Sequence, residues 1–537
     1  MKLVTVSQMQ KIEKDADKGG LTYDMMMENA GQGLADVVFD LFADDLEPEV
    51  VGLVGPGNNG GDTLVALTAL AESGWGASAY LVKRKQNDLV SRFTEAGGEL
   101  ITGVDAFEQL AESIEVADVL LDGVLGTGIK LPLKKDAAEL LEEVNVILEG
   151  LDEPPYVIAV DCPSGVDCDS GDVAEQVIPA DLTVTMAAVK QGLLKLPAFE
   201  YIGELEVVDI GLPAKLKSHK DVKTEVAEAL SISMLLPERP LASHKGTFGT
   251  ALLVAGSLAY TGAAALAGEA AYRAGAGLVT LAVPAPLHSA LAARLPEATW
   301  VLLPHEKGGI SASAVEVLEK HYEKASALLI GPGLGTESGA KDFMEKLFNG
   351  RSSAKKSAGM GFLQGDGGSK KGDDVKRPPM VFDADGLTLL SKITDWHKKI
   401  PADSILTPHP GEMASLTGLS KEEIQEDRQA GVGKFAKNWK QVVVLKGAFT
   451  VVAAPDGRVT VIPVASPALA RAGTGDVLAG LITGLRAQGL DAFDAAGAGA
   501  WIHAQAGLYA ADDLGTAASV LAGDVLTSIS DVLSDLE

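Results

Sequence analysis

The feature of this chain that most constrains its fold is a repeated alternation of short apolar runs with helical stretches. In the first part of the chain, the runs are rich in β-branched residues and lie at Val50–Val54, Ala77–Val82, Val119–Leu121, Tyr156–Val160, Leu182–Thr185 and Leu205–Val208. Continuous apolar runs, without polar residues at alternate positions, indicate strands buried on both faces. Strands of this kind separated by helices predict an α/β domain with a parallel sheet.

A second series of such runs predicts a second α/β domain. It is separated from the first by the charged stretch between Leu212 and Leu241, which lacks strand signals and contains Pro237 and Pro240. Its runs are Ala251–Val254, Leu278–Val283, Ala327–Ile330, Met380–Phe382, Ser404–Leu406, Val442–Leu445, Thr450–Ala453 and Val459–Pro463, before a long helical end from Asp476. The intervening segment Asn349–Pro379, rich in Gly, Ser and Lys, is typical of a mobile surface insertion.

Composition narrows the class of protein. The 537 residues suffice for two or three domains. The chain has 45 Lys and Arg against 74 Asp and Glu, and the formal net charge of −29 disfavours binding to nucleic acid or an anionic membrane. Two cysteines, Cys162 and Cys168, without a partner cluster of His or Cys, exclude a disulfide framework and a zinc site. Because the sequence has neither a signal-peptide pattern nor an apolar stretch of about 18 residues, we expect a soluble cytoplasmic protein.

A Gly-rich segment, Gly55–Asp62, follows the first apolar run and precedes the helical stretch Thr63–Ser73. Backbone N–H groups of a tight turn at a helix N-terminus bind phosphate oxygens, so the segment predicts a binding site for a phosphate-bearing ligand. It matches neither GxGxxG nor a Walker A loop. A plain strand-to-helix turn is the alternative, but two Asn and one Asp are more polar side chains than such a turn requires.

Two further polar turns, Asp122–Gly128 and Asp161–Asp167, each begin with an Asp at the end of an apolar run. In open α/β sheets the carboxyl ends of the strands meet along one crevice, so the three turns should converge on one ligand site. Either Asp alone is also compatible with an ordinary helix N-cap. Carboxylate, amide, hydroxyl and carbonyl oxygens suit a hard cation better than a transition metal.

The segments GPGNNGGD, DGVLGTG and DCPSGVD, together with the helical MMMENAG element at Met25–Gly31, resemble the NAD(P)H-hydrate epimerase family over residues 1–225. The resemblance implies a Rossmann-like three-layer domain that binds a damaged dinucleotide. It implies that Asp161 is a catalytic, proton-moving carboxylate. It implies potassium ligands at Asn59, Asp122 and Ser164. Substrate contacts are implied at Asn58, Asn59, Gly60, Gly61, Asp62, Gly126, Thr127, Gly128, Ile129, Lys130, Leu131, Pro132 and Asp161.

In the second domain, Ala472-Gly473-Thr474-Gly475-Asp476 precedes a long helical stretch. N–H groups and one carboxylate at a helix start are what a phosphoryl transfer site requires, although Asp476 is equally compatible with a simple helix-dipole charge. Lys446–Thr450 joins two strand-like runs, as a nucleotide-binding hairpin does. His409 lies near Glu412, but this HPGE spacing is not the H-E-x-x-H pattern of zinc enzymes, so we expect no metal site there.

The motifs HKGTFG, GSLAYTGA, GPGLG, DADGL, TPHPGEM, KGAFT and AGTGDVLAG resemble the ADP- or ATP-dependent NAD(P)H-hydrate dehydratase family, with a ribokinase-like α/β/α fold, over residues 226–537. The resemblance implies that Asp476 is catalytic and contacts substrate. Further substrate contacts are implied at Gly333, His409, Pro410, Gly411, Glu412 and Met413. Adenine-nucleotide contacts are implied at Lys446, Gly447, Ala448, Phe449, Thr450, Ser466, Arg471, Ala472, Gly473, Thr474 and Gly475. Magnesium is expected with the nucleotide.

The two domains together resemble the bifunctional NAD(P)H-hydrate repair enzyme family. The implied substrates are NADH and NADPH hydrates and an adenine nucleotide, ADP or ATP, and we also expect a homo-oligomer. Two other interpretations stay open. A ribokinase-like kinase for a vitamin precursor would accumulate a phosphorylated product. A non-catalytic N-terminal regulatory module is the second, and Asp161 together with the Asn58–Asp62 turn argues against it.

Overall fold

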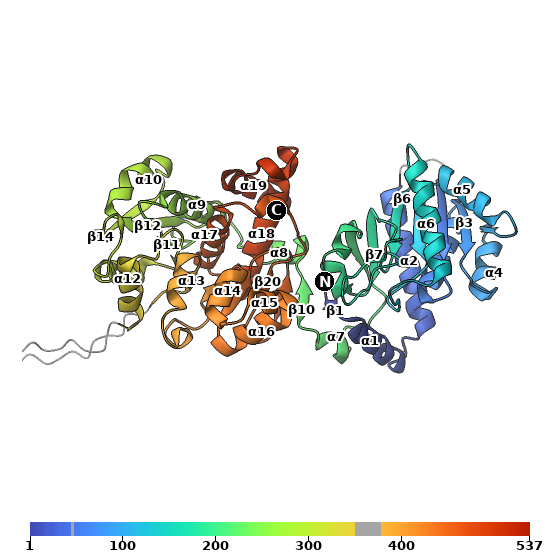
Figure 1. Ribbon diagram of the computed structural model, residues 1–537, viewed down its shortest axis with the longest axis horizontal. Coiled ribbons are helices and arrows are strands. Elements are labelled where there is room, and N and C mark those ends of the chain that lie inside the picture. The colour runs from blue at the N-terminus through green and yellow to red at the C-terminus, as the bar shows by residue number, and fades with distance from the viewer. Residues whose placement is uncertain (44–47, 350–376) are drawn as a thin grey trace, which may run out of the picture. The chain divides into compact units, whose positions relative to one another are not determined.

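The computed structural model describes residues 1–43, 48–349 and 377–537, and it divides into two compact units, Met1–Val226 and Ala227–Glu537. The expected mobile insertion Asn349–Pro379 falls largely outside the described residues. Each unit is built on its own mainly parallel sheet (Figure 1).

The first unit alternates strands with helices. Its helices are α1 (Val6–Lys18), α2 (Tyr23–Leu41), α3 (Asn58–Glu72), α4 (Asp88–Glu95), α5 (Ala106–Val116), α6 (Lys135–Gly150) and α7 (Lys217–Lys220). Its strands are β1 (Leu3–Val4), β2 (Glu49–Val54), β3 (Gly76–Leu81), β4 (Glu99–Ile101), β5 (Val119–Gly123), β6 (Tyr156–Val160), β7 (Leu182–Met186), β8 (Val189–Lys190), β9 (Glu204–Val208) and β10 (Thr224–Val226).

The central sheet of the first unit is buried on both faces. In β2, Val50 and Val54 pack into one apolar cluster with α1, α2, α3 and α4, whereas Val51 and Leu53 pack into another with α5 and α6. Side chains of a strand point to alternate faces, so an unbroken apolar run supplies both clusters at once. This is the three-layer Rossmann-like architecture expected from the sequence.

The strand order of this sheet places its ligand-binding edge. The order is β4-β3-β2-β5-β6-β7-β9, and all neighbouring strands are parallel. From β2 the chain adds strands outward on one side, through β3 to β4, and it then returns to add β5 and the later strands on the other side of β2. The order of strand addition therefore reverses between β2 and β5. In such sheets ligands bind beyond the carboxyl ends of the strands at this reversal. The segments that follow β2, β5 and β6 are the three polar turns singled out in the sequence.

The second unit is a larger α/β domain. Its helices are α8 (Ala229–Ser233), α9 (Thr261–Arg273), α10 (His288–Arg294), α11 (Ala314–Leu318), α12 (Ser338–Asn349), α13 (Asp385–Leu390), α14 (Pro410–Thr417), α15 (Lys421–Glu426), α16 (Arg428–Trp439), α17 (Thr474–Ala487), α18 (Ala492–Asp513) and α19 (Ala522–Asp535). Its strands are β11 (Thr250–Val254), β12 (Leu278–Pro284), β13 (Thr299–Leu303), β14 (His305–Glu306), β15 (Gly309–Ile310), β16 (Ala327–Ile330), β17 (Met380–Phe382), β18 (Ile405–Leu406), β19 (Val442–Leu445), β20 (Val451–Ala453) and β21 (Val459–Val461).

The main sheet of this unit runs β21-β20-β19-β18-β17-β16-β11-β12-β13. The pairs β19–β20 and β20–β21 are antiparallel and the others are parallel, so Lys446–Thr450 forms the expected hairpin connection. Val381 of β17 packs into the apolar cluster of α9, α17, α18 and α19, whereas the ring of Phe382 lies 6.0 Å from that of Phe348 in α12. Helices therefore cover both faces, which confirms the expected ribokinase-like α/β/α class.

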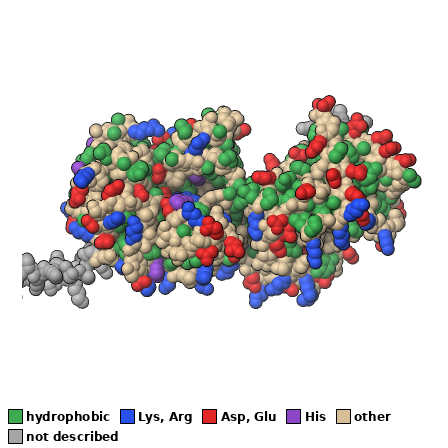
Figure 2. Space-filling view, in the orientation of Figure 1, with side chains coloured by type: hydrophobic (Ala, Val, Ile, Leu, Met, Phe, Trp, Pro, Cys, Tyr) green, Lys and Arg blue, Asp and Glu red, His purple; other side chains and the backbone are tan. Residues whose placement is uncertain are grey.

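Among the boundaries that differ from the expectations, two concern the Gly-rich segments. Asn58–Asp62 forms the first turn of α3 rather than a loop before it, and Thr474–Asp476 forms the first turn of α17. Gly and Asn have low helix propensity, which hid these helix starts in the sequence. Acidic and basic side chains are interspersed over the face seen in Figure 2. Within the described ranges, no helix is both long and apolar enough to cross a membrane.

Two candidate active sites

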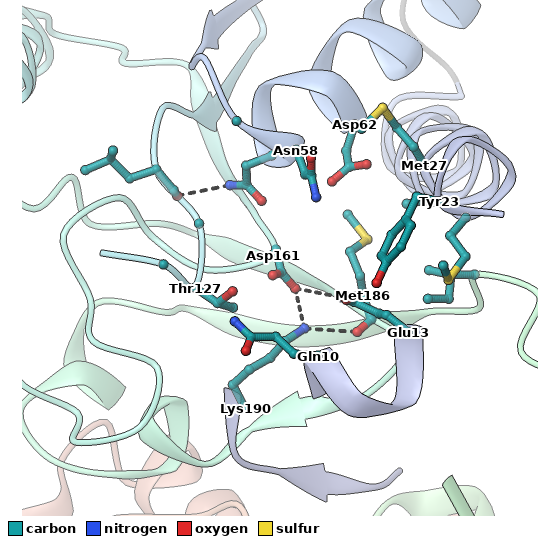
Figure 3. A pocket seen from close by; sticks show the side chains of 18 of the residues that line it. Gln10, Glu13, Tyr23, Met27, Asn58, Asp62, Thr127, Asp161, Met186 and Lys190 are labelled. Carbon is teal, nitrogen blue, oxygen red and sulfur yellow. Dashed lines mark hydrogen bonds and ion pairs between the residues drawn. The ribbon is translucent and has the colours of Figure 1, made fainter. Parts of the chain in front are cut away.

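The first candidate site is a pocket of about 630 Å³ at the carboxyl edge of the sheet in the first unit. Its wall is built by α1 and α2, by the first turn of α3, and by the segments that follow β5, β6 and β7 (Figure 3). The lining is mixed polar and apolar. Its polar groups include Gln10, Glu13, Tyr23, Asn58, Asn59, Asp62, Thr127, Asp161 and Lys190.

Asp161 and Lys190 form a buried ion pair in this pocket. Oδ1 of Asp161 accepts hydrogen bonds from the ammonium of Lys190, from the hydroxyl of Thr185 at 3.1 Å and from the backbone N–H of Met186 at 3.0 Å. The Lys190 side chain is only 1% exposed and that of Asp161 is 14% exposed. In the described chain Oδ2 of Asp161 has no hydrogen-bond partner, so this oxygen is available to a ligand.

The backbone around Asp161 is held in an uncommon conformation. Its φ is 65°, in the left-handed region that Asp tolerates better than most residues. Its N–H donates to the carbonyl of Val184 at 2.8 Å, a bond that ties it to the middle of β7. Such strain is stored where the surrounding structure imposes it, and it recurs at functional sites.

Three further carboxyl groups line the same pocket, those of the exposed Asp24 and of the more buried Glu13 and Asp62. Burial raises the pKa of Glu13, and the charge of Asp161 adds to this while Lys190 opposes it. Burial likewise raises the pKa of Asp62 well above its usual range, with Asp161 and Glu13 adding to the shift. Three carboxyl groups around one ammonium favour the protonated form of at least one of them.

A cluster of oxygen atoms lies beside this pocket around the predicted potassium ligands. Asp122 is fully buried, and its carboxylate accepts from the backbone N–H of Ser164 at 2.7 Å and from its hydroxyl at 2.5 Å. The amide of Asn59 donates to the carbonyls of Val160 at 2.6 Å and Leu125 at 3.0 Å. Burial raises the pKa of Asp122 although both bonds from Ser164 oppose the shift. Among the described residues, no lysine or arginine pairs with this carboxylate.

The structure brings most of the predicted residues of this unit to the pocket, but not all. Asn58, Asn59, Asp62, Gly126, Thr127, Gly128, Ile129 and Asp161 line it, whereas Gly60, Gly61, Lys130, Leu131 and Pro132 do not. Gly60 has a packing role, because a Cβ there would lie 2.1 Å from the carbonyl oxygen of Gly55. The absence of that side chain lets α3 begin directly against the end of β2.

The second candidate site is a pocket of about 420 Å³ in the second unit. It lies between the β19–β20 connection, the segment before α17, and α18. Of the predicted nucleotide-binding residues, those that line it are Lys446, Gly447, Ala448, Thr450, Ser466, Arg471, Thr474 and Gly475. Three of the predicted residues do not line it: Phe449, Ala472 and Gly473. Gly473, with a φ of 93°, is the N-cap residue of α17 and so precedes the free N–H groups of the first turn of that helix.

Asp476 lies in a group of charged side chains near this pocket. Lys446 donates to Oδ1 of the buried Asp383 at 2.7 Å, and its ammonium lies 3.7 Å from Glu412. Burial raises the pKa of Asp476 to about 7, with Asp383 and Asp385 adding to the shift and Lys446 opposing it. A pKa in this range is the one at which general acid–base catalysis is most efficient near neutral pH, so the environment of Asp476 is suited to proton transfer.

The predicted substrate-binding residues of the second unit are less concentrated. His409 lines the pocket, but Gly333, Pro410, Gly411, Glu412 and Met413 do not. The imidazole of His409 caps α14 by accepting from the N–H of Gly411 at 3.0 Å and of Glu412 at 3.4 Å. These two bonds give His409 a structural role at the start of α14. His503, unmentioned by any motif, lines the pocket with Nε2 at 2.9 Å from the carbonyl of Thr474.

Three charged groups of these sites were missed in the sequence. Lys190 and Glu13 belong to no Gly-rich motif, and nothing local separates them from surface charges. Asp383 stands directly after the apolar run Met380–Phe382, in the DADGL turn. Its position at the end of a strand was the signal in the sequence that it lies near a ligand site. Its ion pair with Lys446 shows that it belongs to the charged group beside the second pocket.

Comparisons with known proteins agree with the motifs. Residues 23–192 match the family described as YjeF-related protein N-terminus, and residues 251–354 and 371–530 match the family described as NAD(P)H-hydrate dehydratase. A solved ADP/ATP-dependent NAD(P)H-hydrate dehydratase from Bacillus subtilis, co-crystallized with ATP/Mg2+, is 29% identical and has a TM-score of 0.46. The match covers 58% of this chain and 99% of that one.

The full-length relatives span both units. The bifunctional NAD(P)H-hydrate repair enzyme Nnr of Moorella thermoacetica is 34% identical, over 100% of this chain and 97% of the relative. The enzyme of the same name from Escherichia coli K12 is 32% identical, over 97% of this chain and 91% of the relative. The resemblance inferred from the motifs is thus confirmed, and the chain belongs to the family of bifunctional NAD(P)H-hydrate repair enzymes.

Proposed function

We propose that this protein repairs hydrated NADH and NADPH with two separate active sites. Residues 1–225 interconvert the R and S hydrates, and residues 226–537 dehydrate the S hydrate at the expense of ADP or ATP. The observation that carries this proposal is that each unit has its own pocket with a carboxylate suited to proton transfer. These are Asp161 in the first pocket and Asp476 beside the second.

In the first unit, epimerisation requires that the C6 hydroxyl leaves one face of the ring and water adds to the other. Asp161 is suited to accept the proton of the incoming water, because one carboxylate oxygen is anchored by three donors and the other is not engaged. Lys190 balances its charge. Polar groups of the α3 turn, including Asn58, are suited to hold the dinucleotide at the N–H groups of a helix N-terminus.

Potassium is the cation that we propose for the cluster of Asn59, Asp122 and Ser164. The residues fit such an ion because the buried carboxylate of Asp122 lacks a cationic partner in the described chain, and because Ser164 and Asn59 bring further oxygen atoms to the segments after β5 and β6. All-oxygen surroundings suit a hard cation. A bound potassium ion would supply positive charge there and fix the segments after β5 and β6, which carry Thr127 and Asp161.

In the second unit, the chemistry is a phosphoryl transfer followed by an elimination. Hydroxide is a poor leaving group, whereas a phosphorylated hydroxyl is a good one that the lone pair of the ring nitrogen can expel. Asp476 accepts the proton of the attacking hydroxyl, and the N–H groups at the start of α17 stabilise the transferred phosphate. Gly473, Thr474 and Gly475 supply this turn.

Magnesium is proposed to enter with the nucleotide, where it would neutralise charge on the phosphates. Within the described ranges, no group of three or more His, Cys, Asp or Glu side chains is arranged to hold a metal ion. A metal held mainly by substrate phosphates, with few protein ligands, fits that finding. The cytoplasmic location and the homo-oligomeric assembly stay predictions.

The experiment that tests the proposal supplies the R and S hydrates of NADH, with ADP or ATP and magnesium. Recovery of the absorbance of reduced nicotinamide, with release of phosphate, is expected with at least one nucleotide. Accumulation of a phosphorylated product instead would identify a small-molecule kinase. No reaction with either nucleotide would refute the proposal.

A further inference from the structure

Epimerisation in the first pocket needs two groups that handle protons, and Asp161 is only one of them. Water leaves one face of the ring and enters at the opposite face, so the leaving hydroxyl needs a proton donor while the incoming water needs a proton acceptor. One carboxylate anchored at a single position cannot reach both faces of the bound ring. This reasoning rests on the proposed function of the first unit.

Lys190 is not the missing donor, despite its place beside Asp161. Its ammonium has three hydrogens, and all three are engaged within the protein. They go to Asp161, to the hydroxyl of Thr185 at 2.9 Å and to the carbonyl of Met186 at 2.9 Å. With 1% of its side chain exposed, Lys190 is held as a charge that balances Asp161 and is not presented to a ligand.

Glu13 occupies a different part of the wall and is differently held. It comes from α1, lines the pocket, and its carboxyl group has no hydrogen-bond partner in the described chain. Figure 3 shows it among the side chains that converge with Asp161 and Lys190 on the pocket. The titratable groups that share the pocket with it are Tyr23 and Asp24 of α2, Asp62 of α3, Asp161 after β6 and Lys190 of β8.

We propose that Glu13 is the second catalytic residue of the epimerase site and donates the proton that lets the C6 hydroxyl leave as water. The C6–O bond breaks, the hydroxyl oxygen keeps the bonding pair and takes the proton of Glu13, and the lone pair of the ring nitrogen forms a C=N bond to C6. Water then adds to the other face and gives one proton to Asp161. One proton passed from Asp161 to Glu13 through the water in the pocket restores the starting state.

The environment of Glu13 suits this role. Desolvation, together with the negative charge of Asp161, raises its pKa, so the protonated form persists closer to neutral pH than for an exposed Glu. Asp24 and Asp62 are the other carboxyl groups that line the pocket beside Asp161. Asp24 is exposed to solvent, whereas Asp62 belongs to the first turn of α3, and the charge of Arg84 acts on it. We therefore assign Asp62 to binding of the dinucleotide and Glu13 to donation of the proton.

The test compares Glu13→Gln with Asp17→Asn in the full-length protein. Asp17 lies one turn further along α1 and does not line the pocket, so it is a matched loss of one carboxylate. The pure R hydrate is supplied without nucleotide, and conversion to S is followed by chromatography across a range of pH. A donor must be protonated, so the parent rate should fall as pH rises through the pKa of Glu13.

Glu13→Gln should lower the epimerisation rate by roughly 10²–10⁴-fold and abolish that alkaline decline. Asp17→Asn should retain both the rate and the decline. Glu13→Ala, assayed with added acetate, should recover part of its lost rate, which a merely structural residue would not. The proposal would be overturned if Glu13→Gln kept the decline of the epimerisation rate at alkaline pH while Asp62→Asn lost it. An inactive parent protein would instead refute the proposed function of the unit.

Discussion

Asp476→Asn is the substitution with the most specific consequences in the second unit. The amide keeps the shape of the carboxyl group but cannot accept a proton, so dehydration should fall by roughly 10²–10⁴-fold while nucleotide binding survives. The pKa of about 7 adds a second signature. One pH unit below that value about a tenth of the group is ionised, and one unit above it about nine tenths, so the parent rate should rise about tenfold across this interval.

The same pKa predicts the sign of a stability effect. Because burial raises the pKa of Asp476 from 3.8 to about 7, ionisation is disfavoured in the folded state. The cost is absent below pH 3.8, grows as the pH rises between 3.8 and about 7, and is fully present above that. Asp476→Asn should therefore unfold at a higher temperature than the parent at pH 8, and at nearly the same temperature at pH 3.5.

The assay supplies the S hydrate with saturating nucleotide and follows reduced nicotinamide against pH, with calorimetry for nucleotide binding. Asp342→Asn, an exposed position on α12, is the matched control and should behave as the parent. Epimerisation should be unchanged in both variants. Dehydration near the parent rate in Asp476→Asn, or a parent profile that is flat between pH 6 and 8, would show that Asp476 is only a charge at a helix start.

Three further predictions concern the first unit and the insertion. Lys190→Met should suppress epimerisation and lower the free energy of unfolding by up to about 3–5 kcal/mol in urea titrations, because it leaves Asp161 unpaired; parent-like stability would contradict this. Asp122→Ala should weaken potassium activation, with partial rescue at high potassium, and a parent indifferent to potassium would refute the cation site. Deleting residues 350–376 should leave the melting temperature within a few degrees if Arg377 is kept, since it donates to the carbonyl of Leu347 at 2.6 Å; a larger fall would assign that segment a structural role.

The strands of both sheets were predictable because each central strand is a continuous apolar run. The strands that escaped prediction include two at sheet edges, Glu99–Ile101 and Thr299–Leu303. An edge strand has one neighbour, and Glu99 and Leu302 are exposed on these two. Short or half-exposed strands of this kind lack the pattern that marks the interior of a parallel sheet.

The candidate sites were predictable where their residues stand in a turn after a strand. Asp161 is of this type and Asp122 lies in the last two residues of β5, so both are found because the carboxyl ends of parallel strands meet at one edge. Glu13 and Lys190 could not be found in this way. They lie 148 and 29 positions from Asp161, and only the fold of α1 over the sheet and the short β8 strand brings them to the same pocket. A single charged residue has no local pattern that distinguishes burial from exposure.

The most direct test of two separate active sites is the fraction of an R and S hydrate mixture that each full-length variant returns to NADH. With nucleotide, the parent should convert the whole mixture. Asp161→Asn should convert the S portion quickly and the R portion only as fast as spontaneous epimerisation allows. Asp476→Asn should convert almost none and still interconvert the two hydrates. A parent that stops at the S portion, or an Asp161→Asn variant that consumes both hydrates at the parent rate, would contradict the account.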